Sequence, residues 1–104
     1  MATSKEYHDY VLEQLSKAGE VRTRRMMGEY LVYYRNKLIG DLCDNTLLVK
    51  LTPGSGRLLP DAQRQYPYEG SRTLMLAVED SEDTALMREL LETLWTELPE
   101  PKKK

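Results

Sequence analysis

The region from residue 21 to residue 51 constrains the fold most, because short polar turns divide it into apolar runs of strand length. The turns are Arg35-Asn36-Lys37 and Asp44-Asn45, and Val, Ile, Tyr and Thr are frequent between them. Loops of two or three residues join antiparallel neighbours, so the pattern predicts a meander of hairpins. A strand over 21–26 is expected to lead into it across the Met27-Gly28 turn.

A helical pattern lies on each side of this region. Thr3 and Glu6 match a capping box and predict a first helix over residues 4–18. Asp80 is expected to cap a last helix, which Pro99 ends. In both segments the apolar residues recur every three or four positions, which predicts one buried face per helix. The positions on this face are Tyr7, Tyr10, Val11, Gln14, Leu15 and Ala18 in the first segment, of which Gln14 is polar, and Leu86, Met87, Leu90, Leu91, Leu94, Trp95 and Leu98 in the last.

Proline and glycine interrupt the pattern between the meander and the last helix. Residues 53–56 (Pro-Gly-Ser-Gly) indicate a flexible connector rather than a phosphate loop, because no Lys-Ser/Thr pair follows. A short helix is expected within 57–65, from about Pro60, and a strand within 73–78.

Two amphipathic helices each need a sheet face to cover. The predicted fold class is therefore α+β: a two-layer sandwich in which the N- and C-terminal helices lie on one face of an antiparallel sheet of about five strands. We expect a single domain over residues 1–98 and a disordered basic tail over 99–104.

Composition narrows the function classes. The single cysteine, Cys43, excludes an intrachain disulfide, and no apolar run is long enough to span a membrane, so a cytoplasmic protein without membrane partners is expected. Residues 22–72 carry nine basic and five acidic side chains, whereas residues 79–100 carry one and eight. An acidic region of this kind repels nucleic acid, so strong non-specific binding to DNA is not favoured.

Short sequence motifs spread over nearly the whole chain resemble those of a known protein family. The most specific is Arg24-Arg25-Met26 followed by Gly28 and Tyr30. The others are Lys5-Glu6-Tyr7, residues 10–15, Val21, Tyr33, Leu42-Cys43-Asp44-Asn45 with Leu47, Val49 and Lys50, Pro67-Tyr68, Leu98-Pro99 and the Pro-Lys-Lys-Lys end. Together they resemble the N-terminal domain family of the TfoX/Sxy competence regulators.

The resemblance implies a secretion-chaperone-like α+β module that stands alone, because nothing here corresponds to the C-terminal helical domain of the longer regulators. It implies no catalytic residues and no cofactor. Met27, Glu29 and Leu31 occupy positions where the family usually has an aromatic residue and two glycines.

Arginines and tyrosines are the candidate functional residues. Alternation along a strand places Arg22 and Arg24 on one face and Arg25 on the other. Arginine binds carboxylate or phosphate through a planar fork, so these side chains form either an anion or partner site or ion pairs with the acidic last helix. Tyrosines suit both edge packing and protein interfaces. The candidate tyrosines are Tyr33, Tyr34, Tyr66 and Tyr68.

The sequence offers few candidate catalytic residues. His8 and Cys43 are the only histidine and cysteine, which argues against a metal centre and leaves a nucleophile–base dyad as a weak option. We therefore expect a non-enzymatic regulatory or adaptor module that binds an unidentified protein, as a monomer or weak homodimer. The alternative is a nucleic-acid-associated regulator that uses Arg22, Arg24 and the Lys102–Lys104 tail.

Overall fold

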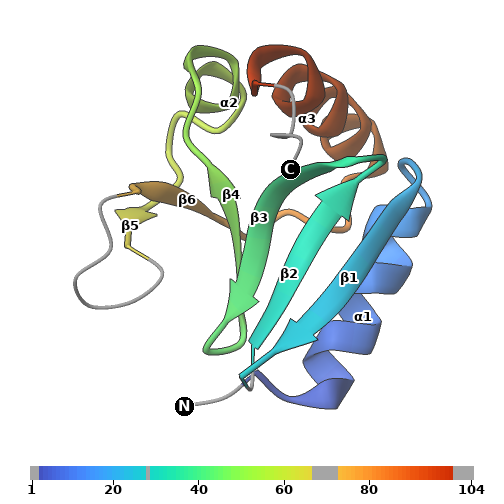
Figure 1. The fold of residues 1–104 in the computed structure, drawn as a ribbon. Coiled ribbons are helices and arrows are strands. Elements are labelled where there is room, and N and C mark those ends of the chain that lie inside the picture. Colours follow the sequence, from blue (N-terminus) through green and yellow to red (C-terminus); the bar gives the residue numbers. More distant parts are fainter. Residues whose placement is uncertain (1–2, 28, 67–72, 100–104) are drawn as a thin grey trace.

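The computed structural model describes residues 3–27, 29–66 and 73–99. These residues form an antiparallel sheet of six strands and three helices (Figure 1). In chain order the elements are α1 (Lys5–Ser16), β1 (Val21–Met26), β2 (Glu29–Tyr34), β3 (Lys37–Cys43), β4 (Thr46–Lys50), α2 (Pro53–Leu58), β5 (Arg64–Gln65), β6 (Met75–Val78) and α3 (Thr84–Glu97).

The predicted meander is confirmed. Strands β1 to β4 pair with their neighbours in sequence, and the full order is β1-β2-β3-β4-β6-β5. Asp44 and Asn45 join β3 to β4 with φ angles of 52° and 55°, the left-handed conformation that tight hairpin turns require. A register shift between Val32 and Tyr33 leaves Ile39 as an extra residue in β3, a bulge that increases the local twist of the sheet.

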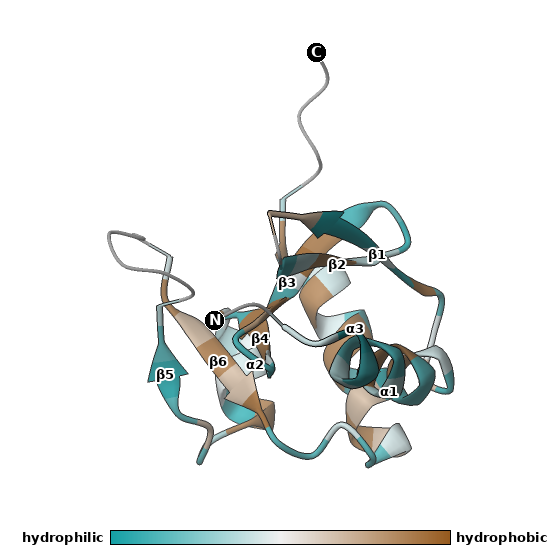
Figure 2. Cartoon of the chain, turned by 90° about the horizontal axis from the view of Figure 1, so that it is seen from below, coloured by the Kyte–Doolittle hydropathy of each residue, from teal (hydrophilic) through white to brown (hydrophobic). Residues whose placement is uncertain are grey.

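Helices α1 and α3 lie on the same face of the sheet, as the two-layer prediction requires (Figure 2). The α+β class is therefore confirmed. The apolar stripes of both helices meet the inward-facing side chains of β2 to β4 and β6 in one core. Its most deeply buried side chains are Val11, Val32, Ile39, Leu42, Leu47, Leu76, Met87, Leu90, Leu91 and Leu94.

Both helix starts differ from the sequence prediction. Ser4, not Thr3, caps α1: its hydroxyl accepts the Tyr7 N–H. The Thr3 side chain is buried and donates to the Glu29 carboxylate. The predicted cap of the last helix, Asp80, is also wrong, because Asp83 accepts the Leu86 N–H and α3 begins at Thr84. Two adjacent hydroxyl residues precede α1 and several acids precede α3, so the local sequence alone does not select the capping residue.

The segment after the meander is the largest departure. The Pro-Gly-Ser-Gly run is not a connector but the first turn of α2, where Thr52 and Ser55 form a capping box. The helix expected within 57–65 is absent from the described chain, and Arg64–Gln65 instead forms β5 beside β6. The sheet therefore has six strands rather than about five. The strand expected at 73–78 begins at Met75.

None of the helices in the described part of the chain has the length and apolar character needed to cross a bilayer. Residues 100–104, most of the expected basic tail, lie outside the described residues.

Candidate functional site

The side of β1 to β3 that faces away from α1 and α3 carries no helix among the described residues; in Figure 1 it faces the viewer. Directly paired residues on neighbouring strands share a face. Arg22 pairs with Tyr33, which pairs with Leu38, and Arg24 pairs with Leu31. We call this surface, made by Arg22, Arg24, Leu31, Tyr33 and Leu38, the open face.

Cations and apolar side chains alternate on the open face. Arg22 and Arg24 are exposed, whereas Leu31, Tyr33 and Leu38 are half-buried. The Arg22 guanidinium lies over the Tyr33 ring, 5.5 Å from its centroid, within the range of a cation–π contact. The predicted juxtaposition of Arg22 and Arg24 is thus confirmed, and the surface is an aromatic and aliphatic patch bordered by two guanidinium groups.

Pairing of these arginines with the acidic last helix does not occur within the described residues. Arg35, in the β2–β3 turn, makes that contact instead, with 3.1 Å between its guanidinium nitrogen and a Glu92 carboxylate oxygen. Arg25 projects from the other face of β1, as predicted, but it is exposed and forms no ion pair with another described residue. The three arginines of β1 therefore keep their charge available to solvent.

Lys37, rather than an arginine, anchors the end of α3. Its side chain is buried, and its ammonium donates to the carbonyl oxygens of Trp95 (2.6 Å) and Leu98 (2.8 Å). It also lies 4.5 Å from the centroid of the Trp95 ring. A cation at a helix C-terminus satisfies carbonyls that have no partner within the helix. The sequence does not signal this role, because Lys37 stands in a predicted turn.

The candidate tyrosines do not form one surface. Tyr33 belongs to the open face, but Tyr34 is buried on the helix side, where its hydroxyl donates to Glu92 and Arg35 lies over its ring. Its assignment to a partner surface is wrong, because α3 covers it. Tyr66 is 55% exposed just after β5, and Tyr68 lies outside the described residues.

Beyond the open face, the same side of the sheet becomes apolar and acidic. Leu48, Met75 and Ala77 form a small buried cluster with Cys43 packed against it. Burial, reinforced by Glu29, raises the pKa of Asp41 to about 6. Burial together with nearby carboxylates raises the pKa of Cys43 to about 11. The Cys43 thiol is therefore protonated at neutral pH and is a poor nucleophile.

His8 lies on the other side of the sheet from Cys43. Its ring stacks on Tyr30 with 4.0 Å between centroids. Its Nδ1 is 2.9 Å from Asp9 and its Nε2 is 2.7 Å from the Thr23 hydroxyl, so both nitrogens are engaged. This contact joins α1 to β1, and the sheet separates it from the cysteine, so the two do not form a dyad. Sequence reasoning missed it because His8 falls outside the apolar stripe of α1.

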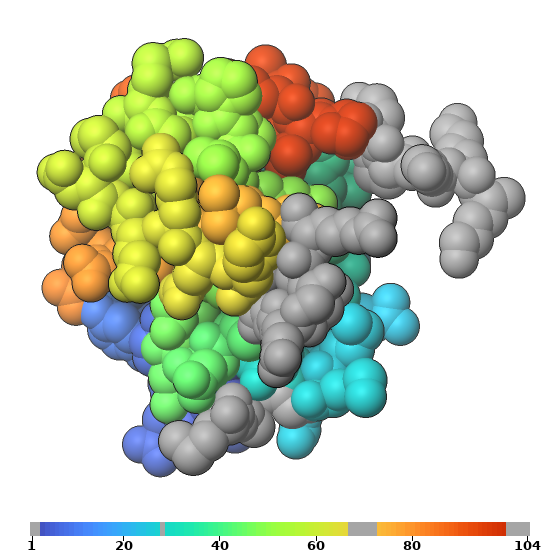
Figure 3. All heavy atoms as spheres, turned by 90° about the vertical axis from the view of Figure 1, so that its left-hand side faces the viewer, coloured from blue at the N-terminus to red at the C-terminus, as the bar shows by residue number. Residues whose placement is uncertain are grey.

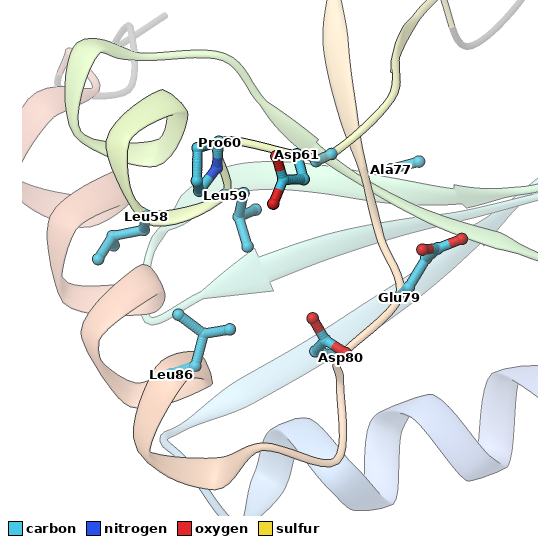
Figure 4. A pocket seen from close by; sticks show the side chains of 9 residues that line it. Leu58, Leu59, Pro60, Asp61, Ala77, Glu79, Asp80 and Leu86 are labelled. Atoms are coloured by element: carbon cyan, nitrogen blue, oxygen red, sulfur yellow. The ribbon is translucent and has the colours of Figure 1, made fainter.

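A pocket of about 130 Å³ lies where α2, β6 and the start of α3 meet (Figure 4). Leu58, Leu59 and Leu86 supply apolar walls, while Asp61 and Asp80 enter from different segments of the chain. In the part of the chain that the structure describes, no group of histidine, cysteine and acidic side chains is arranged to hold a metal ion. The carboxylates would repel anions, so this pocket does not share the chemistry of the open face.

The fold and this surface define an α+β protein whose antiparallel sheet has a basic, aromatic face that no helix of the described residues covers. The chain belongs to the same family as the uncharacterized 12.7 kDa protein in the trpE 5′ region of Spirochaeta aurantia. The two are 33% identical over 102 residues, which cover 98% of this chain and 89% of the relative. No protein-family model matches the chain, and no solved structure matches it.

Proposed function

We propose that the protein is a non-enzymatic regulatory or adaptor module that binds another protein through the open face. The observation that carries the proposal is the composition of this uncovered surface. Tyr33, Leu31 and Leu38 stand half-exposed between Arg22 and Arg24. Aromatic residues and arginine are the side chains enriched at protein interfaces, where an apolar centre is surrounded by a polar rim.

The chemistry of the other reactive groups supports a binding role. The surroundings of Cys43 raise the pKa of its thiol further, to about 11, so little thiolate is present at neutral pH. Both nitrogens of His8 are engaged, Nδ1 with Asp9 in α1 and Nε2 with Thr23 in β1. The resemblance of Arg24-Arg25-Met26 and its neighbours to the TfoX/Sxy N-terminal domains also supports a regulatory module.

A double variant, Leu31→Asn with Tyr33→Ala, tests the proposal. Wild-type and variant proteins would be immobilised and used to capture partners from the source cells, followed by calorimetry with each purified partner. We expect one stoichiometric partner whose affinity falls at least about tenfold in the variant, since loss of a central aromatic anchor typically costs more than 1 kcal/mol. If wild type and the double variant bind the partner with equal affinity, the open face is rejected as the binding surface.

Two controls make this result specific. Tyr10→Ala removes an exposed tyrosine from α1, outside the open face, and we expect this variant to bind the partner as wild type does. Thermal melting verifies that every variant is folded.

The nucleic-acid alternative, which rests on Arg22, Arg24 and the lysine tail, predicts binding to duplex or single-stranded probes that weakens steeply with salt. Such binding would replace the protein-partner proposal.

A further inference from the structure

Strand β1 forms one edge of the sheet, and within the described residues this edge has no neighbouring strand. The opposite edge is β5, which is only two residues long, whereas β1 runs for six residues and is largely exposed (Figure 1). Short edge strands resist further pairing, and long ones provide a template for another strand. Among the described residues, no other strand lies beside the outer edge of β1.

The hydrogen bonds fix which backbone groups face outward. The Arg35 N–H donates to the Glu20 carbonyl at 3.1 Å, so residues 20 and 35 face each other as a hydrogen-bonded pair. Such pairs alternate along an antiparallel ladder, and Thr23 and Arg25 therefore turn their N–H and C=O groups away from β2. Val21 also faces outward, but its N–H donates to the Gly19 carbonyl. Within the described chain, the outward groups of Thr23 and Arg25 have no backbone partner.

The side chains on this edge specify the charge of an incoming strand. Arg22 and Arg24 stand on the open face, Arg25 stands on the other face, and all three are exposed. A second copy of β1 would bring like charges together across the new ladder, which destabilises cross-strand pairs. A strand carrying carboxylates on both of its faces would instead meet a guanidinium on either side.

We propose that the free edge of β1 binds an extended acidic segment of another protein as a seventh strand. The inference rests on the proposed function and deepens it, because it gives the partner a chemical class and a backbone geometry. Main-chain hydrogen bonds to Thr23 and Arg25 supply affinity, and the arginines select acidic sequences. The adjoining open face would then contact the body of the same partner.

A synthetic peptide tests the edge without the natural partner. The probe is a capped, fluorescein-labelled peptide of nine residues, with four consecutive glutamates flanked by valine and threonine. One control peptide carries lysines in place of the glutamates, and another carries N-methyl groups on its four central backbone nitrogens. Methylation keeps the charge and removes the donors that a ladder needs. Fluorescence anisotropy measures affinity, and NMR hydrogen exchange follows the Thr23 and Arg25 amides.

Matched protein variants separate the edge from general charge. Arg22→Gln with Arg24→Gln alters the edge, and Arg57→Gln with Arg64→Gln removes two exposed arginines from the α2 and β5 side of the molecule, lime to yellow in Figure 3. We expect the glutamate peptide to bind wild type and to lose about tenfold in affinity on methylation, the effect of two or more lost hydrogen bonds. The edge variant should weaken binding about three- to tenfold, and the control pair less than twofold. The Thr23 and Arg25 amides should become protected.

Other outcomes overturn the inference. Absence of peptide binding would do so, as would equal affinity for the methylated peptide, which indicates charge attraction alone. Amide protection that grows with protein concentration and without peptide would assign the edge to a second copy. Capture of a partner that depends on Tyr33, without peptide binding, would reject the edge and leave the proposed function intact. If the peptide binds as expected but partner capture is unchanged by the Tyr33 substitution, the β1 edge is supported as a binding site and the open face is rejected as one.

Discussion

Two partly or fully buried charges, Lys37 and Asp41, are treated differently by the fold. The Lys37 ammonium has carbonyl acceptors at the end of α3. Asp41 has one buried carboxylate oxygen without a hydrogen-bond partner in the described chain. An unsatisfied buried carboxylate costs free energy when it is ionised, which is why burial raises its pKa. Asp41 therefore lowers the stability of the fold at neutral pH.

The Asp41→Asn variant should be more stable than wild type above pH 6. Because the pKa rises from 3.8 unfolded to about 6 folded, the folded state holds the proton more tightly. The destabilisation is absent below pH 4, grows between pH 4 and pH 6, and is complete above pH 6. We expect a gain of about 1–2 kcal/mol at pH 7.5, less than the full shift would give at about 1.4 kcal/mol per pKa unit, because solvent screens the partly exposed carboxylate. Urea unfolding at several pH values measures it.

Asp61→Asn is the matched control, because Asp61 is exposed. Its free energy of unfolding should follow the wild-type pH profile to within about 0.5 kcal/mol. If the free energy of unfolding of Asp41→Asn changes with pH in parallel with that of wild type from pH 4 to pH 7, this pH dependence does not come from Asp41.

At the scale of the elements, the close approach of α2 to α3 depends on a glycine. The Gly54 N–H donates to the Glu97 carboxylate at 2.8 Å. Hydrogen bonds from Thr52 and from this N–H lower the pKa of Glu97. A Cβ atom on Gly54 would lie 2.2 Å from the Thr93 methyl group and 2.6 Å from a Glu97 oxygen. A Cβ atom on Gly56, one half-turn further along α2, would make only ordinary van der Waals contacts, the nearest with a Leu51 methyl group 3.5 Å away.

We expect alanine at these two glycines to have opposite effects. Gly54→Ala should destabilise the protein by about 1–3 kcal/mol, because α2 must move away from α3. Gly56→Ala should stabilise it by about 0.5–1 kcal/mol, because alanine favours the helix. Chemical unfolding measures both. Equal effects of the two changes would show that contact between α2 and α3 does not determine the position of α2.

The elements also show which structural features local sequence patterns can predict and which they cannot. Local patterns specify the meander and the alternation that places Arg22 and Arg24 together, because turns and strand periodicity are local. The Pro-Gly-Ser-Gly run was misinterpreted because its helix depends on a cap and on contacts with Glu97, 43 residues away. The burial of Tyr34 depends on α3 in the same way. A two-residue strand such as β5 has no periodicity to detect.

At the scale of the molecule, the arginines of β1 have a second consequence. Charged side chains on an edge strand keep sheets from pairing edge to edge. With β5 only two residues long at the other side, β1 is the edge at which such pairing would occur. The same residues that select an acidic strand therefore keep copies of the chain apart.

Removing this protection should promote self-association. We expect Arg22→Thr with Arg24→Thr to sediment as larger species than wild type at equal concentration, because threonine favours strands and carries no charge. Sedimentation velocity over a concentration series measures the change. The matched pair Arg57→Thr with Arg64→Thr should sediment as wild type does. If the two double variants sediment identically, the charges of β1 do not protect its edge from self-association.

The order in which the strands pair also bears on how the chain is made. Strands β1 to β4 find all their early partners within about thirty residues of newly synthesised polypeptide, and contacts of short sequence separation form quickly. The helix that supplies Met87, Leu90, Leu91 and Leu94 is translated afterwards. During synthesis, the growing chain therefore passes through an interval in which α1 alone covers the apolar face of the sheet and the part that α3 will cover is exposed. During that interval we expect a chaperone to bind it.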